Sequence, residues 1–95
     1  MTETIRTTFE LGRVLATPGA LEALEESGET SHPYLQRHAS QDWGEVCSED
    51  REENELALRE DFRLFSVYRL KDGTMLWIIT EADRSATTIL LPSEY

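Results

Sequence analysis

The sequence has little cysteine, few basic residues and no long apolar run. Its single cysteine, Cys47, cannot form a disulfide within the chain or supply a zinc site built from several cysteines. No apolar run approaches the roughly 18 residues of a membrane-spanning helix. The opening MTETIRTTFE also lacks the basic and then apolar regions of a signal peptide. We therefore expect a cytoplasmic protein.

Positive charge is scarce, because 9 Lys and Arg residues stand against 19 Asp and Glu residues, for a net charge of −10. Direct binding to nucleic acid needs Lys and Arg to neutralise phosphates, and anionic membranes need basic segments for the same reason. The charge therefore indicates a basic protein partner or, alternatively, only high solubility. The whole excess lies in residues 1–61, so the charge should be distributed unevenly over the molecule.

The 95 residues, of which 39% are apolar, predict a single domain over residues 1–95 with one modest core. Apolar alternation predicts a strand over residues 4–16, bent at Gly12. Thr17, followed by proline, is a typical helix start, and Gly28 is a typical helix end, so a short helix should lie between them. A similar Ser-x-Pro signal predicts a second short helix over residues 32–39.

A third helix is predicted over residues 49–60. Its cap is either Ser48 or the capping-box pair Asp50 and Glu53. Only a thin apolar stripe is available for burial, formed by Ala57 and Leu58 with Leu56 at its edge. Most of this helix must therefore face water, with its acidic side chains outward.

The C-terminal third predicts an antiparallel meander. FRLFSVYRL and TMLWIIT flank an Asp-Gly turn, which is a strong hairpin signal. A two-residue turn would pair Tyr68 with Trp77, whereas a three-residue turn with Gly73 left-handed would place Val67 opposite Trp77. The sequence leaves both registers open. SATTILL adds a third strand, which Pro92 ends.

The predicted fold class is α+β, with a three- to four-stranded antiparallel sheet and two or three short helices packed on one face. The C-terminal meander supplies three strands, and the N-terminal segment supplies a fourth. Because the strands are apolar at successive positions, neither face looks fully exposed. The N-terminal segment or a second subunit would cover the other face.

Residue types that are common in active sites gather in the stretch RHASQDWGEV. The spacing of His32 and His38 is not that of two helical metal ligands, and acidic neighbours oppose activation of the Cys47 thiol. A triad of His38, Ser40 and Asp42 is rejected because triads are assembled from distant segments. We therefore predict no catalytic residue, no cofactor and no metal. His38 is expected to be a half-buried helix residue bonded to a backbone group.

Trp43 and a polar cluster near the C-terminus can each be interpreted as structural or as part of a binding surface. Trp43 either anchors its loop to the core, which we favour, or is an exposed hot spot beside His38 and Asp42. A second polar cluster is predicted to form a hairpin connection with an Asp-Arg contact, or alternatively a polar rim for protein recognition. This cluster consists of Glu81, Asp83 and Arg84.

The chain resembles a family of small uncharacterised bacterial proteins of plasmids and other mobile elements, often labelled plasmid-related protein or type I restriction subunit M. The matching stretches are ATPGALEAL (16–24), RHASQDWGEV (37–46), SEDREENELAL (48–58) and the tail from residue 64 to 95. The second label does not fit, because a methyltransferase subunit needs a far larger fold and a donor-binding loop. In this family a glycine often precedes Asp-Trp-Gly, where this chain has Gln41.

The resemblance implies a mobile-element context, in which small acidic proteins block host defence by occupying the basic grooves of nucleases. The predicted function is a non-enzymatic protein-binding module, an anti-restriction or anti-CRISPR inhibitor of the DNA-mimic type whose partner is a basic nuclease or nucleoprotein. The partner-binding acids would be Glu49, Asp50, Glu52, Glu53, Glu55, Glu60 and Asp61. The alternatives are a metal-binding or enzymatic accessory protein centred on His38, Asp42 and Cys47, and a dimerising element that uses its apolar sheet.

Overall fold

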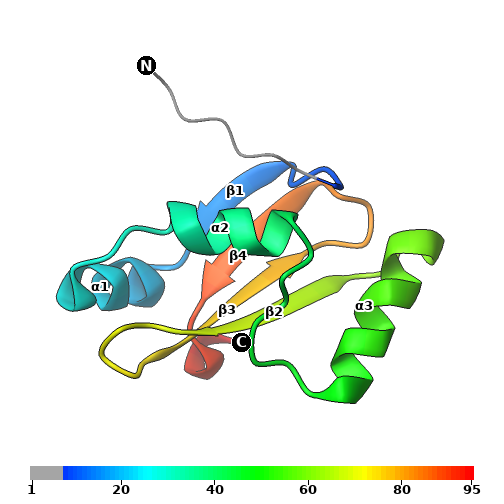
Figure 1. The fold of residues 1–95 in the computed structure, drawn as a ribbon. Helices are drawn as coiled ribbons and strands as arrows, with labels where there is room; N and C mark the ends of the chain where they lie inside the picture. The colour runs from blue at the N-terminus through cyan, green and yellow to red at the C-terminus, as the bar shows by residue number, and fades with distance from the viewer. Residues whose placement is uncertain (1–7) are drawn as a thin grey trace.

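The structure is a computed structural model that describes residues 8–95. It contains a four-stranded sheet with the strand order β1-β4-β3-β2 and three α-helices, which confirms the predicted α+β class (Figure 1). In chain order the elements are β1 (Arg13–Ala16), α1 (Pro18–Ser27), α2 (His32–Ala39), α3 (Ser48–Glu60), β2 (Leu64–Arg69), β3 (Met75–Thr80), β4 (Ala86–Leu90) and the 3-10 helix η1 (Pro92–Glu94).

The sheet is mixed, because β1 pairs with β4 in parallel while the other two strand pairs are antiparallel. The prediction of a purely antiparallel sheet is wrong at this pair. Parallel neighbours need a long connection, and three helices and a hairpin separate β1 from β4 here. The strand is also shorter than the predicted 4–16. Phe9 and Leu11 precede it, and Ile5 lies outside the described residues.

Gly12, where the sequence predicts a bend within a longer strand, lies directly before β1, and the chain bends at Thr8 and Phe9 instead. Gly12 has φ 64°, and a Cβ at this position would lie 2.4 Å from the carbonyl carbon of Ser85. Any other residue would therefore be both strained and in collision with the backbone of the loop before β4. The close approach lets the N–H of Arg13 donate to the Ser85 carbonyl at 3.0 Å, which starts the parallel pairing.

The first helix begins and ends where the sequence predicted. The Thr17 hydroxyl accepts a hydrogen bond from the N–H of Ala20 at 3.1 Å, and Gly28 ends α1 in the left-handed conformation. Helix α2 also has the predicted bounds. Both predicted caps of α3 are wrong. Its N-cap is Cys47, whose side chain makes no capping hydrogen bond, so the helix begins one residue earlier than expected.

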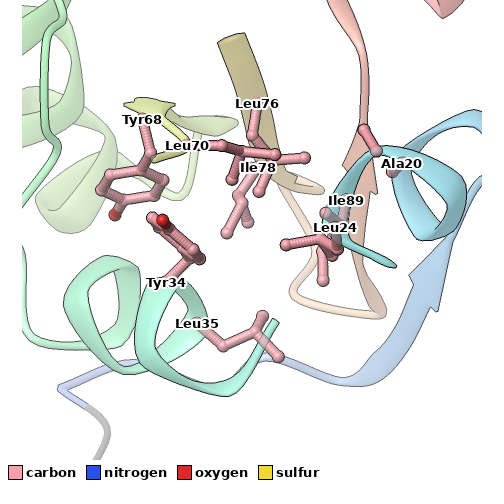
Figure 2. Close-up of a cluster of buried hydrophobic side chains, with 10 residues drawn as sticks. Ala20, Leu24, Tyr34, Leu35, Tyr68, Leu70, Leu76, Ile78 and Ile89 are labelled. Carbon is pink, nitrogen blue, oxygen red and sulfur yellow. The ribbon is translucent and has the colours of Figure 1, made fainter. Parts of the chain in front are cut away.

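Helices α1 and α2 cover one face of the sheet, as predicted, and α3 lies beside the edge strand β2 (Figure 1). The main core fills the space between α1, α2 and that face (Figure 2). Tyr34 and Tyr68 meet there with their ring centroids 5.6 Å apart. The remaining large side chains of this core are Leu24, Leu35, Leu70, Leu76, Ile78 and Ile89.

The hairpin between β2 and β3 has the register of the three-residue turn. Val67 lies opposite Trp77, and Gly73 has φ 93°. The N–H of Leu70 donates to the carbonyl of Thr74 at 2.8 Å, which closes the loop around the left-handed glycine. The right-handed strand twist and the Asp-Gly pair are compatible with both turn lengths, so the sequence left both registers open. The structure selects the three-residue turn.

Helix α3 is fastened to the outer edge of β2 by one amide side chain that the sequence interpretation missed. Asn54 is only 2% exposed. Its Oδ1 accepts from the N–H of Phe65 at 3.0 Å, and its Nδ2 donates to the carbonyl of the same residue at 2.7 Å. The amide thus takes the place of a neighbouring strand at this point of the edge. Beside it the fully buried Ala57 allows the helix to approach closely.

We predict that Asn54→Ala lowers the free energy of unfolding by about 2 kcal/mol, because both backbone groups of Phe65 lose their partner in a partly buried site. Urea denaturation followed by circular dichroism measures this change. Glu55→Ala, on the exposed side of the same helix, is the matched control and should change stability by less than about 0.5 kcal/mol. Equal effects of the two substitutions would show that the amide does not fasten the helix.

Candidate functional site

His38 is fully buried and lies in a chain of hydrogen-bonded side chains at the centre of the molecule. Its Nδ1 is 2.5 Å from the Ser66 hydroxyl, and its Nε2 is 2.8 Å from the Thr80 hydroxyl. The Thr80 hydroxyl lies 2.8 Å from that of Thr87, which donates to the Leu11 carbonyl at 2.7 Å. The prediction of a half-buried histidine bonded to the backbone is therefore wrong, because two strand hydroxyls hold the ring.

The order of donors along this chain fixes the tautomer of His38. A hydroxyl has one hydrogen to donate, and the hydrogen of Thr87 points to the Leu11 carbonyl. Thr80 must then donate to Thr87, so the Thr80 oxygen accepts from the imidazole Nε2–H. Nδ1 is left unprotonated and accepts from the Ser66 hydroxyl. The neutral ring with its proton on Nε2 satisfies every position of the chain.

Burial lowers the pKa of His38 from its ordinary value of 6.5 to about 3. The imidazole is therefore neutral across the physiological range, and a group with so low a pKa is a poor general base. Two aromatic rings enclose it edge-on, with centroids at 5.4 Å for Phe9 and 5.5 Å for Trp43. His38 is a structural residue and cannot be the exposed hot spot considered from the sequence.

Trp43 anchors its loop, as the favoured interpretation held. It is 3% exposed and stacks on Phe9 with a centroid distance of 6.1 Å. The alternative of an exposed Trp43 hot spot is contradicted by this burial. The Trp43 carbonyl accepts from the N–H of Val67 at 3.0 Å, and the Val67 carbonyl accepts from the N–H of Glu45 at 2.7 Å. The loop therefore covers the edge of β2 at Val67, next to the point where Asn54 bonds to Phe65.

Asp42 holds the same loop from its exposed side. Its carboxylate accepts from Arg37 at 2.7 and 3.4 Å and from the N–H of Gly44 at 3.2 Å. The bond from Arg37 lowers the pKa of the Asp42 carboxyl, so it stays ionised. The preceding residue, Gln41, has φ 68°, a conformation that favours glycine. Asp42 and its neighbours thus shape a turn.

Cys47 is exposed at the start of α3, whereas His38 is enclosed in the core. The two side chains therefore lie in different environments and do not form a nucleophile and base pair. Within residues 8–95, no group of His, Cys, Asp and Glu side chains is arranged to hold a metal ion. The structure does not bring His38, Asp42 and Cys47 together into the metal-binding or enzymatic site considered from the sequence.

The second polar cluster is organised around Arg84, which binds backbone carbonyls. Its guanidinium donates to the carbonyl of Phe62 at 2.7 Å and to that of Ala57 at 2.9 Å, at the C-terminal end of α3. Asp83 accepts instead from the N–H of Ser85 at 3.0 Å. The predicted Asp-Arg contact is therefore replaced by a helix cap. Glu81 is exposed beside it, and its carbonyl also accepts from Arg84 at 3.1 Å.

The acidic side chains of α3 form the largest set of predicted site residues that the structure leaves open to water. We call this set the acidic face. Asp50 is half-buried and the others are exposed; they are Glu49, Glu52, Glu53, Glu55, Glu60 and Asp61. The ion pairs found within residues 8–95 join Arg37 to Asp42 and Arg69 to Glu45, so neither uses an acid of this face.

No protein-family model, curated protein sequence or solved structure matches this chain. None of the helices within residues 8–95 has both the length and the apolar character to cross a bilayer. The choice among the functional hypotheses therefore rests on the residues and surfaces of the chain and on the resemblance of its motifs.

We predict that the stability contribution of neutral His38 is complete above pH 6.5 and is lost as the pH falls toward 3. The unfolded chain takes up a proton in this range and the folded chain does not, so the free energy of unfolding declines by up to about 1.4 kcal/mol per pH unit. Urea denaturation at a series of pH values measures the slope. His38→Gln should flatten it, and the control Leu21→Ser, at an exposed leucine of α1, should not. A wild-type slope that His38→Gln leaves unchanged would contradict the prediction.

Proposed function

We propose that the protein is a non-enzymatic protein-binding module whose acidic face binds a basic protein. The observation that supports this best is the placement of seven carboxylates on and just after one helix, whose inner side is fixed to the edge of β2. A fixed helix holds its charges in one arrangement, which lowers the cost of ordering them when a partner binds.

The environments of the residues that resemble catalytic ones favour binding over catalysis. His38 is buried and neutral, and Asp42 is paired with Arg37 in a turn. The Ser66 hydroxyl beside His38 is fully buried, and the exposed Cys47 lies apart from that ring. A protein that acts by binding through its surface needs no catalytic nucleophile or base.

The negative charge of the acidic face indicates that its partner carries positive charge. A face with this density of carboxylates repels phosphates, so we do not propose direct contact with nucleic acid or with an anionic membrane. A basic groove is attracted to it over distances up to the Debye length, about 8–10 Å at moderate salt. Such attraction raises the association rate and falls as salt increases.

The resemblance to proteins of mobile elements narrows the proposal to host defence. We propose that the acidic face stands in for the phosphates of DNA in the groove of a basic nuclease or nucleoprotein, as an anti-restriction or anti-CRISPR inhibitor acting in the cytoplasm. The exposed acids Glu49, Glu52 and Glu53 lie at positions i, i+3 and i+4 of α3, on one side of the helix. They would form the centre of the contact.

We predict that the triple substitution of Glu49, Glu52 and Glu53 by lysine lowers affinity for a basic nuclease captured from a bacterial lysate by at least about tenfold, because each reversal places like charges opposite each other. The matched control replaces Glu22, Glu25 and Glu26, which are exposed on α1, by lysine and changes the net charge equally. Titrations at low and high salt measure both variants. Equal losses, or binding indifferent to salt, would contradict the role of the acidic face.

A second candidate, homodimerisation, is favoured by the outer edge of β1. Val14 and Leu15 are 47% and 43% exposed on this edge strand, and no strand pairs with its outer side within residues 8–95. Unpaired apolar edges tend to pair with another chain. The edge of β2, in contrast, is covered by Asn54 and by the loop at Gly44.

We predict for this candidate that the chain sediments as a dimer at micromolar concentration and that Leu15→Lys converts it to a monomer, because a charge at the centre of a paired edge opposes association. Sedimentation velocity measures both, and Leu21→Lys, at an exposed leucine of α1, is the control. A monomeric wild-type chain would remove the candidate.

A further inference from the structure

Exposed apolar side chains interrupt the acidic face and continue beyond it. Leu56 is 40% exposed and lies at position i+7 from Glu49, on the same side of α3. Phe62, just after the helix, is 53% exposed. Both line one hollow together with Glu53 and Arg63, so apolar and acidic groups share a single surface. Pure phosphate mimicry would not need these two side chains.

Next to this hollow lies a groove on the face of the sheet opposite α1 and α2. We call it the aromatic groove. It has a volume of about 200 Å³ and is lined by Asp50, Arg63, Phe65, Trp77, Ile79 and Tyr95. The Trp77 ring meets the Phe65 ring at 5.0 Å and the Tyr95 ring at 5.6 Å between centroids. Tyr95 itself is 70% exposed.

The size and lining of the groove indicate its occupant. Small-molecule sites usually measure about 300–1,000 Å³, so this groove suits one side chain of a protein partner. Its walls are aromatic, and Asp50 extends the acidic face to its rim. Arg63 joins the groove to the hollow at Leu56 and Phe62 because it lines both.

We propose that a basic amphipathic segment of the partner binds along this surface, with its Lys and Arg side chains on the acidic face and an apolar side chain in the aromatic groove. This inference rests on the proposed function and adds an apolar anchor to it. Charge complementarity selects a basic segment, and the exposed Leu56, Phe62 and Tyr95 select an apolar side chain within it.

The test uses the full chain labelled with ¹⁵N and two synthetic peptides of equal charge. One peptide is lysine-rich with leucine and phenylalanine at helical spacing, and the other has serine at those positions. The apolar peptide should bind at least about tenfold more tightly. It should shift the indole signal of Trp77 and leave that of the buried Trp43 in place. The variant Tyr95→Ser, at the exposed wall of the groove, should lose this preference, and the control Leu21→Ser should keep it.

Several outcomes would overturn the inference. Equal, salt-sensitive binding of both peptides at α3 would remove the groove and leave the proposed function standing. Failure of both peptides to shift any signal of α3 would contradict the two together. A Trp77 signal that moves with protein concentration in the absence of peptide would assign the groove to a second copy of the chain instead.

Discussion

The buried hydrogen-bond chain through His38 is the interaction on which the rest of the structure depends. It joins α2 to β2 through Ser66, to β3 through Thr80, and then through Thr87 of β4 to the backbone of Leu11 before β1. A buried polar group costs free energy unless it is paired. Because each donor in the chain has an acceptor, the chain fixes the relative position of four elements. Burial lowers the pKa of the imidazole and so keeps it neutral.

The position of α2 in turn determines how the backbone edge of β2 is covered. The loop that leaves α2 brings Gly44 against Val67, where a Cβ would lie 2.0 Å from the Val67 carbonyl oxygen. One step further along the strand, Asn54 completes the backbone hydrogen bonds of Phe65. The edge is thereby closed, and α3 is held with its short buried side inward. The acidic side of α3 faces water, so the fold presents a negative surface beside β2.

Local signals in the sequence predicted the elements but not their long-range partners. Thr17 and Gly28 fixed the ends of α1, because caps depend only on nearby backbone groups. The parallel pairing of β1 and the burial of His38 depend on residues far along the chain, so spacing could not reveal them. Asn54 had one usable signal, since it lies three residues before Ala57 and is in phase with the buried stripe. The acidic run around it concealed that signal.

We propose that α3 and the adjoining aromatic groove form the binding surface of the protein, and that the stretch RHASQDWGEV supports it from behind. Hydrogen–deuterium exchange of the chain alone and bound to a captured basic protein tests this most directly. We predict slower exchange on binding in residues 49–65 and at Trp77, with α1 unchanged. Protection confined to α1 or to the outer edge of β1, with residues 49–65 unaffected, would contradict it.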